Sequence, residues 1–128
     1  MCAVTNSFAT RAGFPDVCLT PTPAGPVPIP YPNFSFEATD VPIAVKLSIG
    51  GAIPGTIADA GTVSLGDQGG TTGVASGVVT GPASGLVGVP KLLLECMPAR
   101  NWVTPHITNS TNCPAFNVIP GQFKVWAL

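Results

Sequence analysis

Proline and glycine interrupt this 128-residue chain so often that helices are nearly excluded. The sequence holds 15 prolines and 15 glycines. Inside a helix, proline costs about 3 kcal/mol and glycine about 1 kcal/mol relative to alanine. Past residue 12, the longest stretch without either residue runs from Asn33 to Val41, which is under three helical turns. We therefore expect a single all-β domain over residues 1–128, built from short hairpins and extended proline-rich segments.

Charged residues are scarce. They make up 9% of the chain beside 45% hydrophobic residues, whereas an ordinary domain has about 25% charged residues. Disordered chains are poor in apolar residues, so this composition argues against disorder. Soluble monomers rarely leave large apolar patches uncovered. We therefore expect a tightly held protein partner.

The remaining charge pattern narrows the class of partner. Five scattered basic residues and a net charge of −1 offer no patch for phosphates, so we expect no nucleic acid. No apolar run reaches about 18 residues, so we expect no integral membrane segment. The first 12 residues lack the pattern of a secretory signal. We expect a protein made in the cytoplasm, whose four cysteines are free thiols or metal ligands.

Two segments carry the strongest local patterns. Phe14–Phe34 contains seven prolines, which predicts an extended, polyproline-like strap packed against a sheet edge. In Val41–Ile49, apolar residues alternate with other residues, which predicts a strand with one buried face. The rest reads as a meander of short strands between glycine-rich turns, namely Thr62–Leu65, Val74–Thr80, Leu86–Val89, Lys91–Met97 and Gln122–Leu128.

The carboxylates give no sign of catalysis. Only Glu37 and Asp40 are close in sequence, and they are typical of a solvated loop, while Asp16 and Asp67 are typical of turns. A dyad of His106 with a cysteine is conceivable, but nothing supplies an orienting third group or oxyanion donors. We therefore expect no enzyme.

Three motifs occur in order along the chain. They are FPDVCLTPTPAGPVPIPYPNF (Phe14–Phe34), SLGDQGGTTGVASGVVTGPA (Ser64–Ala83) and HITNSTNCP (His106–Pro114). Together they resemble the PAAR-like family, whose hallmark is a Pro-Asp-Val-Cys segment followed by Pro-Ile-Pro-Tyr-Pro-Asn. The resemblance covers residues 14–114 and leaves residues 115–128 as a short C-terminal extension. One departure falls at residues 95–98, Glu-Cys-Met-Pro, where the family has a Glu-Gly-Lys-Pro-type turn.

The resemblance implies a small conical fold and a mechanical function. Members sharpen the spike of type VI secretion and related contractile injection systems, and their broad base docks on a trimeric valine-glycine-repeat protein. The chain would then leave the producing cell on the spike and enter the target. An adaptor that recruits a separate toxin effector is the alternative, and a metal- or thiol-dependent enzyme is a third. Residues 115–128 are too short for a toxin domain, so we expect any effector to be another chain.

Related PAAR proteins often hold a zinc ion with His and Cys side chains. By this resemblance, His106 and Cys113 are the first candidate ligands, and Cys18 and Cys2 could complete the tetrahedral set that structural zinc requires. The alternative is a satisfied surface histidine with buried, apolar cysteines. For Cys2 and Cys96 that alternative is favoured.

Overall fold

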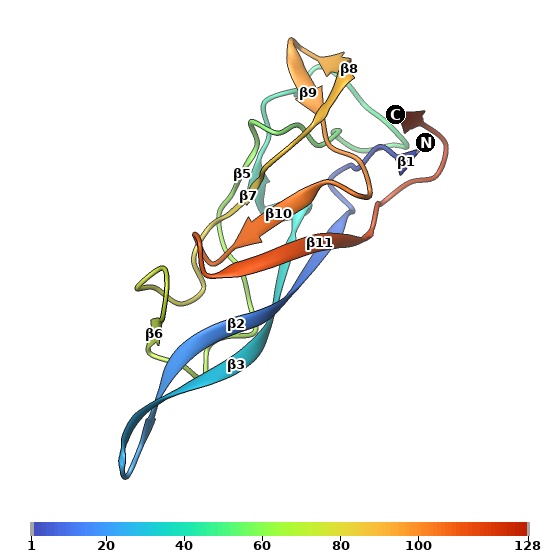
Figure 1. Cartoon of the computed structure of the whole chain (residues 1–128). Helices are drawn as coiled ribbons and strands as arrows, with labels where there is room; N and C mark the ends of the chain where they lie inside the picture. The colour runs from blue at the N-terminus through green and yellow to red at the C-terminus, as the bar shows by residue number, and fades with distance from the viewer. Residues whose placement is uncertain (1, 128) are drawn as a thin grey trace.

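The computed structural model describes residues 2–127 and confirms an all-β domain (Figure 1). In this range the only helical element is a single 3-10 turn, η1 (Glu37–Thr39), and no helix is long and apolar enough to cross a membrane. The strands are β1 (Cys2–Ala3), β2 (Thr10–Thr22), β3 (Gly25–Phe36), β4 (Asp40–Val41), β5 (Ala60–Gly61), β6 (Thr72–Gly73), β7 (Ala83–Gly85), β8 (Val89–Leu94), β9 (Met97–Ala99), β10 (Pro105–Thr108), β11 (Cys113–Ile119) and β12 (Trp126–Ala127).

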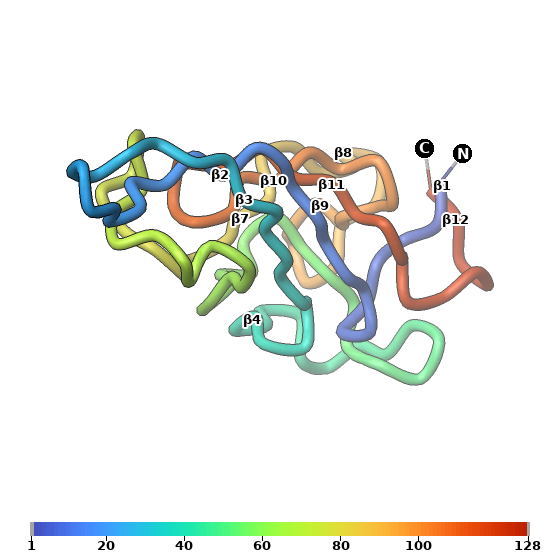
Figure 2. Tube along the Cα trace, turned by 90° about the horizontal axis from the view of Figure 1, so that it is seen from below, coloured from blue at the N-terminus to red at the C-terminus, as the bar shows by residue number. Residues whose placement is uncertain are grey.

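One sheet dominates the molecule. Its order is β3-β2-β11-β10-β7-β5-β4, and β6 pairs with β2 outside that path. The pairs β8–β9 and β1–β12 form separate two-stranded sheets. The molecule tapers from an end that holds both termini and the β8–β9 hairpin to a narrow end formed by the β2–β3 hairpin (Figures 1 and 2). We call these the broad end and the narrow end.

The proline-rich segment Phe14–Phe34 is extended and reaches the sheet edge as predicted, but it forms most of the β2–β3 hairpin of the sheet and not a strap over other structure. β2 and β3 pair antiparallel along most of their length, with Leu19 opposite Pro28 and Val17 opposite Pro30. Proline has no backbone N–H to donate to β2. Pro28 and Pro30 therefore occupy positions of β3 at which a backbone N–H would face away from β2, toward the free edge of the sheet. Prolines at 26, 28, 30 and 32 therefore remove the donors from the free edge of β3, which blocks the addition of another strand there.

The predicted strand at Val41–Ile49 is also wrong. Only Asp40–Val41 is a strand, and the apolar positions Val41, Ile43, Val45 and Leu47 are exposed, whereas Ala44 is buried. The backbone donors in this segment find other acceptors. The Ile43 N–H donates to Asp59 Oδ1 at 2.9 Å, and the Lys46 N–H donates to Glu95 Oε1 at 2.7 Å. Side chains from distant loops thus replace a neighbouring strand.

After residue 60, the strands β5, β6 and β7 lie beside the predicted runs at residues 62–65, 74–80 and 86–89, whereas β8 coincides with most of the predicted run at residues 91–97. Residues 74–80 form a turn in which the Gly77 N–H donates to the Gly73 carbonyl at 2.9 Å. The run at residues 91–97 belongs to the β8–β9 hairpin, whose turn residues Glu95 and Cys96 have φ of 47° and 70°. Both lie in the left-handed region that glycine adopts most easily. The hairpin therefore keeps the turn without the family's glycine.

The last residues are part of the domain rather than an appendage. β11 lies between β2 and β10 in the main sheet, and β12 pairs with β1. The strand expected within Gln122–Leu128 is present as Trp126–Ala127, while Leu128 lies outside the described residues.

The interior of the molecule is polar and its surface is apolar. All six phenylalanines and both tryptophans are exposed. The apolar core cluster is small, comprising Val4, Ala44, Leu94 and Ala99. The largest fully buried side chains are instead Arg11, Arg100 and His106. Burying polar groups is unfavourable unless they are hydrogen-bonded, so these side chains need partners inside the molecule.

Candidate functional site

The structure does not bring the four predicted metal ligands together. In the described part of the chain, one group of three or more His, Cys, Asp or Glu side chains has all its ligand atoms within 4.8 Å of one another, and it is Asp16, Cys18 and Asp67. Cys18 is its only predicted member. His106 and Cys113 are offset by two residues along β10 and β11, a diagonal of about 7–8 Å in a sheet.

Asp16 is the centre of a buried network near the narrow end, and not the turn residue that the sequence suggested. Asn33 on β3 donates to its Oδ2 at 2.5 Å. Asn109 donates to Oδ1 at 3.2 Å and to Oδ2 at 3.3 Å, and Asn112 also donates to Oδ1. Asp16, Asn33 and Asn109 are fully buried. We call this set of residues, with Cys18 and Asp67, the Asp16 centre.

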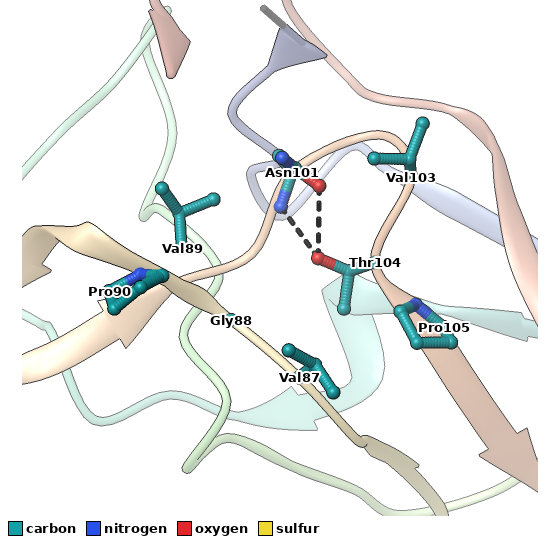
Figure 3. Close-up of a pocket in the computed structure, with 8 residues that line it drawn as sticks. All are labelled: Val87, Gly88, Val89, Pro90, Asn101, Val103, Thr104 and Pro105. Atoms are coloured by element: carbon teal, nitrogen blue, oxygen red, sulfur yellow. Dashed lines mark hydrogen bonds between the residues drawn. The ribbon is translucent and has the colours of Figure 1, made fainter. Parts of the chain in front are cut away.

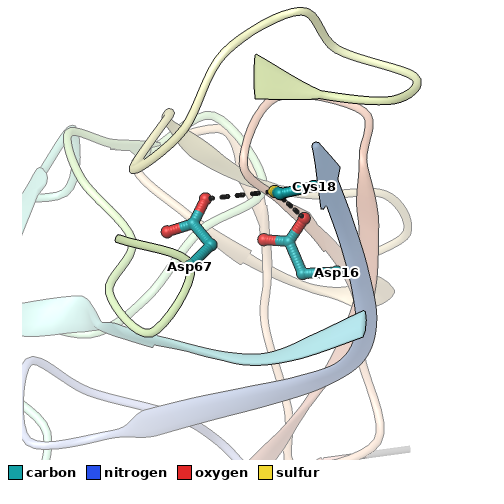
Figure 4. Close-up of side chains that lie close together, drawn as sticks. All are labelled: Asp16, Cys18 and Asp67. Carbon is teal, nitrogen blue, oxygen red and sulfur yellow. Dashed lines mark hydrogen bonds between the residues drawn. The ribbon is translucent and has the colours of Figure 1, made fainter. Parts of the chain in front are cut away.

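Cys18 and Asp67 complete the Asp16 centre (Figure 4). The thiol of Cys18 donates to Asp16 Oδ1 at 3.5 Å and lies 4.0 Å from Asp67 Oδ2. Burial, with the adjacent Asp16 carboxylate, raises the pKa of this thiol to about 12. Burial also raises the pKa of Asp67, whose Oδ2 accepts the Thr80 N–H at 2.9 Å. The thiol is therefore a protonated donor at neutral pH.

The residues of the Asp16 centre do not fit a metal ion. A carboxylate offers about four acceptor sites, and those of Asp16 are taken by three amide groups and a thiol. Two of these amides, Asn109 and Asn112, cannot turn their oxygens inward. Asn109 Oδ1 accepts the Gly81 N–H at 3.0 Å, and Asn112 Oδ1 accepts the Ala75 N–H at 2.7 Å. The N–H and S–H groups thus point their hydrogens at the Asp16 carboxylate, whereas a cation at this position would need oxygen or sulfur lone pairs to face it.

The second buried centre contains both arginines of the chain, and it shows that Glu37 and Asp40 are not in a solvated loop. Arg11 Nη2 lies 2.5 Å from Asp40 Oδ1, and Arg100 Nη1 lies 2.7 Å from Asp40 Oδ2. Glu37 Oε1 is 3.7 Å from Arg100 Nη1. Arg100 Nη2 also donates to the carbonyl of Asp59 at 2.5 Å. We call this set the arginine centre.

Ionisation in the arginine centre is strongly perturbed. Burial raises the pKa of Glu37 to about 7, although Arg100 and Arg11 oppose the shift. Burial and the same two arginines lower the pKa of His106 to about 2. His106 is buried and its Nε2 lies 3.2 Å from Asn117 Nδ2, so it is not the surface histidine of the alternative interpretation. A neutral imidazole beside two guanidinium groups limits the positive charge that is buried.

Two surface hollows formed by the described residues are lined without a charged side chain. One of about 200 Å³ lies between β8 and β10 and includes Asn101 and Thr104, which hydrogen-bond each other, with Val87 and Val103 at its rim (Figure 3). A groove of about 430 Å³ crosses β3, β2 and β11 and is lined by Phe14, Phe34, Phe116, Ala12, Gly13, Pro32 and Pro114. Apolar side chains make up most of the lining of both.

Sequence reasoning missed the three asparagines of the Asp16 centre. Asn33, Asn109 and Asn112 stand inside the first and third motifs, and that position was the available signal. Nothing local shows that residues 93 or 96 positions away from Asp16 donate to it.

The described residues form a tapered, all-β domain with two buried polar centres and an apolar exterior, which agrees with the PAAR-like resemblance of the sequence. The family comparison identifies it directly, because residues 9–115 match the toxin PAAR-like domain. The chain belongs to this family. Membership associates it with spike-tip or toxin-associated modules of contractile injection systems. No curated protein and no solved structure gives a significant match.

Proposed function

We propose that this chain is a non-catalytic tip that caps and sharpens the trimeric spike of a type VI secretion or related contractile injection system. The observation that carries the proposal is the exposure of every phenylalanine and tryptophan around a polar interior. A soluble monomer would not keep so much aromatic surface in water. A protein partner that covers part of this surface accounts for it.

The taper supports the orientation of the proposed tip. The narrow end is a two-stranded hairpin, and its outer strand carries prolines that fix φ and remove edge donors (Figure 1). The broad end holds both termini and offers a wider area for docking. A chain of this kind is made in the cytoplasm of the producing cell, leaves on the spike and enters the target.

An aromatic cluster at the broad end is the proposed contact with the spike. Trp102 and Phe123 pack edge to face at a centroid distance of 5.7 Å, and Phe123 lies 6.3 Å from Trp126. Trp126 belongs to β12, beside the termini. Exposed tryptophans are frequent anchors of protein interfaces. We expect the Trp126→Ala and Phe123→Ala variants to bind the spike at least about tenfold more weakly.

A toxin adaptor is the second candidate, and the apolar groove around Phe34 and Phe116 favours it. This groove lies on the main sheet, away from the aromatic cluster that includes β12. It could hold an effector while the broad end holds the spike. An enzyme has least support, since the buried titratable groups serve the two polar centres.

Separate pull-down experiments distinguish these functions. The tip proposal expects the purified chain to retain the spike trimer with no effector present, and Trp126→Ala to lose it. Phe116→Ala is the matched control, because it removes an exposed aromatic side chain from the groove and should keep spike binding. If the chain retains an effector but not the spike, the adaptor function is correct and the tip function is not.

A further inference from the structure

We infer that the Asp16 centre fastens the narrow half of this domain in place of a metal ion, so that folding of the chain is independent of zinc. Structural zinc ties together segments that a small core would leave loose. The Asp16 carboxylate makes the same kind of junction with hydrogen bonds alone. This inference does not depend on spike binding.

The junction joins four segments that are distant in sequence. Asp16 lies on β2, and the donors reach it from β3 at Asn33 and from the β10–β11 turn at Asn109 and Asn112. Cys18 extends the contacts to Asp67, which is 49 residues away. Hydrogen bonds to an ionised carboxylate are about twice as strong as neutral ones. One buried ion therefore holds β2, β3, the β10–β11 turn and the segment around Asp67.

The β10–β11 turn is shaped to deliver its two amides. Asn109 and Ser110 have φ of 50° and 61°, a left-handed conformation that asparagine tolerates better than most residues. Each amide is clamped at its oxygen by a backbone N–H, from Gly81 on Asn109 and from Ala75 and Ser76 on Asn112. The NH2 groups are thus aimed at Asp16 before any ligand arrives.

Few ligand atoms remain for an ion. Asp67 Oδ1 is the one carboxylate oxygen of the Asp16–Cys18–Asp67 group that has no hydrogen-bond partner, and it points away from Cys18 (Figure 4). Asn33 Oδ1 is the other free acceptor nearby. A metal ligand thiol must be deprotonated, whereas the Cys18 thiol donates to a carboxylate. One carboxylate oxygen and one amide oxygen do not make a zinc site.

Thermal unfolding of the full chain tests the inference directly. The chain is purified, its zinc is measured by elemental analysis, and unfolding is followed in excess EDTA and again with added zinc, calcium or magnesium. We expect well under one zinc per chain and melting temperatures that agree within about 1 °C. About one zinc per chain, or a fall of the melting temperature by more than about 5 °C in EDTA, would overturn the inference.

Two substitutions separate the network from a metal site. We expect Asp16→Asn to lower the melting temperature by at least about 10 °C, because it removes the charge that three amides and the thiol address. Cys18→Ala should lower it by less than half as much, because it removes one weak donor. Glu95→Gln is the matched control, since it removes an exposed charge while its amide oxygen can still accept the Lys46 N–H, so the melting temperature should stay nearly unchanged.

The response of these variants to metal is decisive even where one of them folds poorly. If the Asp16 centre is a hydrogen-bond network, the melting temperatures of wild type and Cys18→Ala both stay unchanged in EDTA. A metal site would instead make wild type sensitive to EDTA, and Cys18→Ala would lose both the ion and that sensitivity. Observation of that second pattern contradicts the inference.

Discussion

The two buried centres lie along the same strand, β2, and they compensate buried carboxylates in opposite ways. The Asp16 centre surrounds one carboxylate with neutral donors whose orientation the backbone fixes. The arginine centre pairs Asp40 with two guanidinium groups, yet it leaves Glu37 Oε1 and Oε2 and Arg100 Nε without hydrogen-bond partners. The neutral amides stabilise the Asp16 carboxylate without adding charge to the interior. The two guanidinium groups each bring a positive charge, which the carboxyl groups of Asp40 and Glu37 must balance. We therefore expect the arginine centre to respond to pH and the Asp16 centre to respond to loss of a single donor.

Loss of a cation from the arginine centre should have the largest effect. Arg100→Met keeps much of the side-chain volume but leaves Glu37 and Asp40 with only Arg11. Removing one partner of a buried ion pair costs about 3–5 kcal/mol, so we expect a loss of that size in the free energy of unfolding, measured by urea denaturation. Lys91→Met is the control at an exposed cation. A loss below about 1 kcal/mol for Arg100→Met would show that the arginine centre does not depend on paired buried charges.

Titration of Glu37 should give the next effect. Its folded pKa is about 7, above the ordinary value of 4.5, so the folded state binds the proton more tightly than the unfolded state. Stability from this group is therefore full below about pH 4.5 and is lost as the pH rises through 7. We expect the stability difference between wild type and Glu37→Gln to change by on the order of 2–3 kcal/mol between pH 4.5 and 8.

The comparison with Glu37→Gln also removes the opposite contribution of His106. The folded pKa of His106 is about 2, so the unfolded state takes up a proton first. Stability from His106 is lost as the pH falls below about 6.5. This contribution is present in both proteins and cancels in their difference. A difference that is flat from pH 4.5 to 8 would show that Glu37 is not buried beside the arginines as described.

How far these centres follow from sequence differs by residue. Proline and glycine spacing correctly excluded helices, because that argument is local. The alternation in Val41–Ile49 predicted a strand, but its backbone donors are satisfied by Asp59 and Glu95, which no local pattern reveals. Arg100 lies 60 residues from its partner Asp40. Contacts of that separation depend on the tertiary fold and not on local periodicity.

Removal of one amide donor from the Asp16 centre should lower the free energy of unfolding by less than the loss of Arg100 from the arginine centre. Asn33→Ala deletes a buried hydrogen bond to the Asp16 carboxylate, and such bonds to charged groups contribute about 1.5–3 kcal/mol. We expect a loss in this range that is the same at pH 5 and pH 8, measured by urea denaturation. A loss that varied with pH as Glu37→Gln does would mean that the two centres are coupled.

A substitution in the β8–β9 turn, outside both buried centres, should give the smallest change in the free energy of unfolding. Cys96 has φ of 70°, which glycine adopts without strain. We expect Cys96→Gly to raise the free energy of unfolding by about 0.5–1 kcal/mol, while Cys96→Ser leaves it unchanged. Equal effects of the two variants would show that the backbone strain is relieved elsewhere.

The central claim is that the apolar exterior of this chain is made to be covered by a spike. Light scattering of the purified chain mixed with the trimeric valine-glycine-repeat protein tests it most directly. The account predicts a complex with one chain per trimer, and a loss of that complex with Trp126→Ala. A wild-type chain that stays monodisperse at high concentration and shows no mass increase with the spike trimer would contradict it.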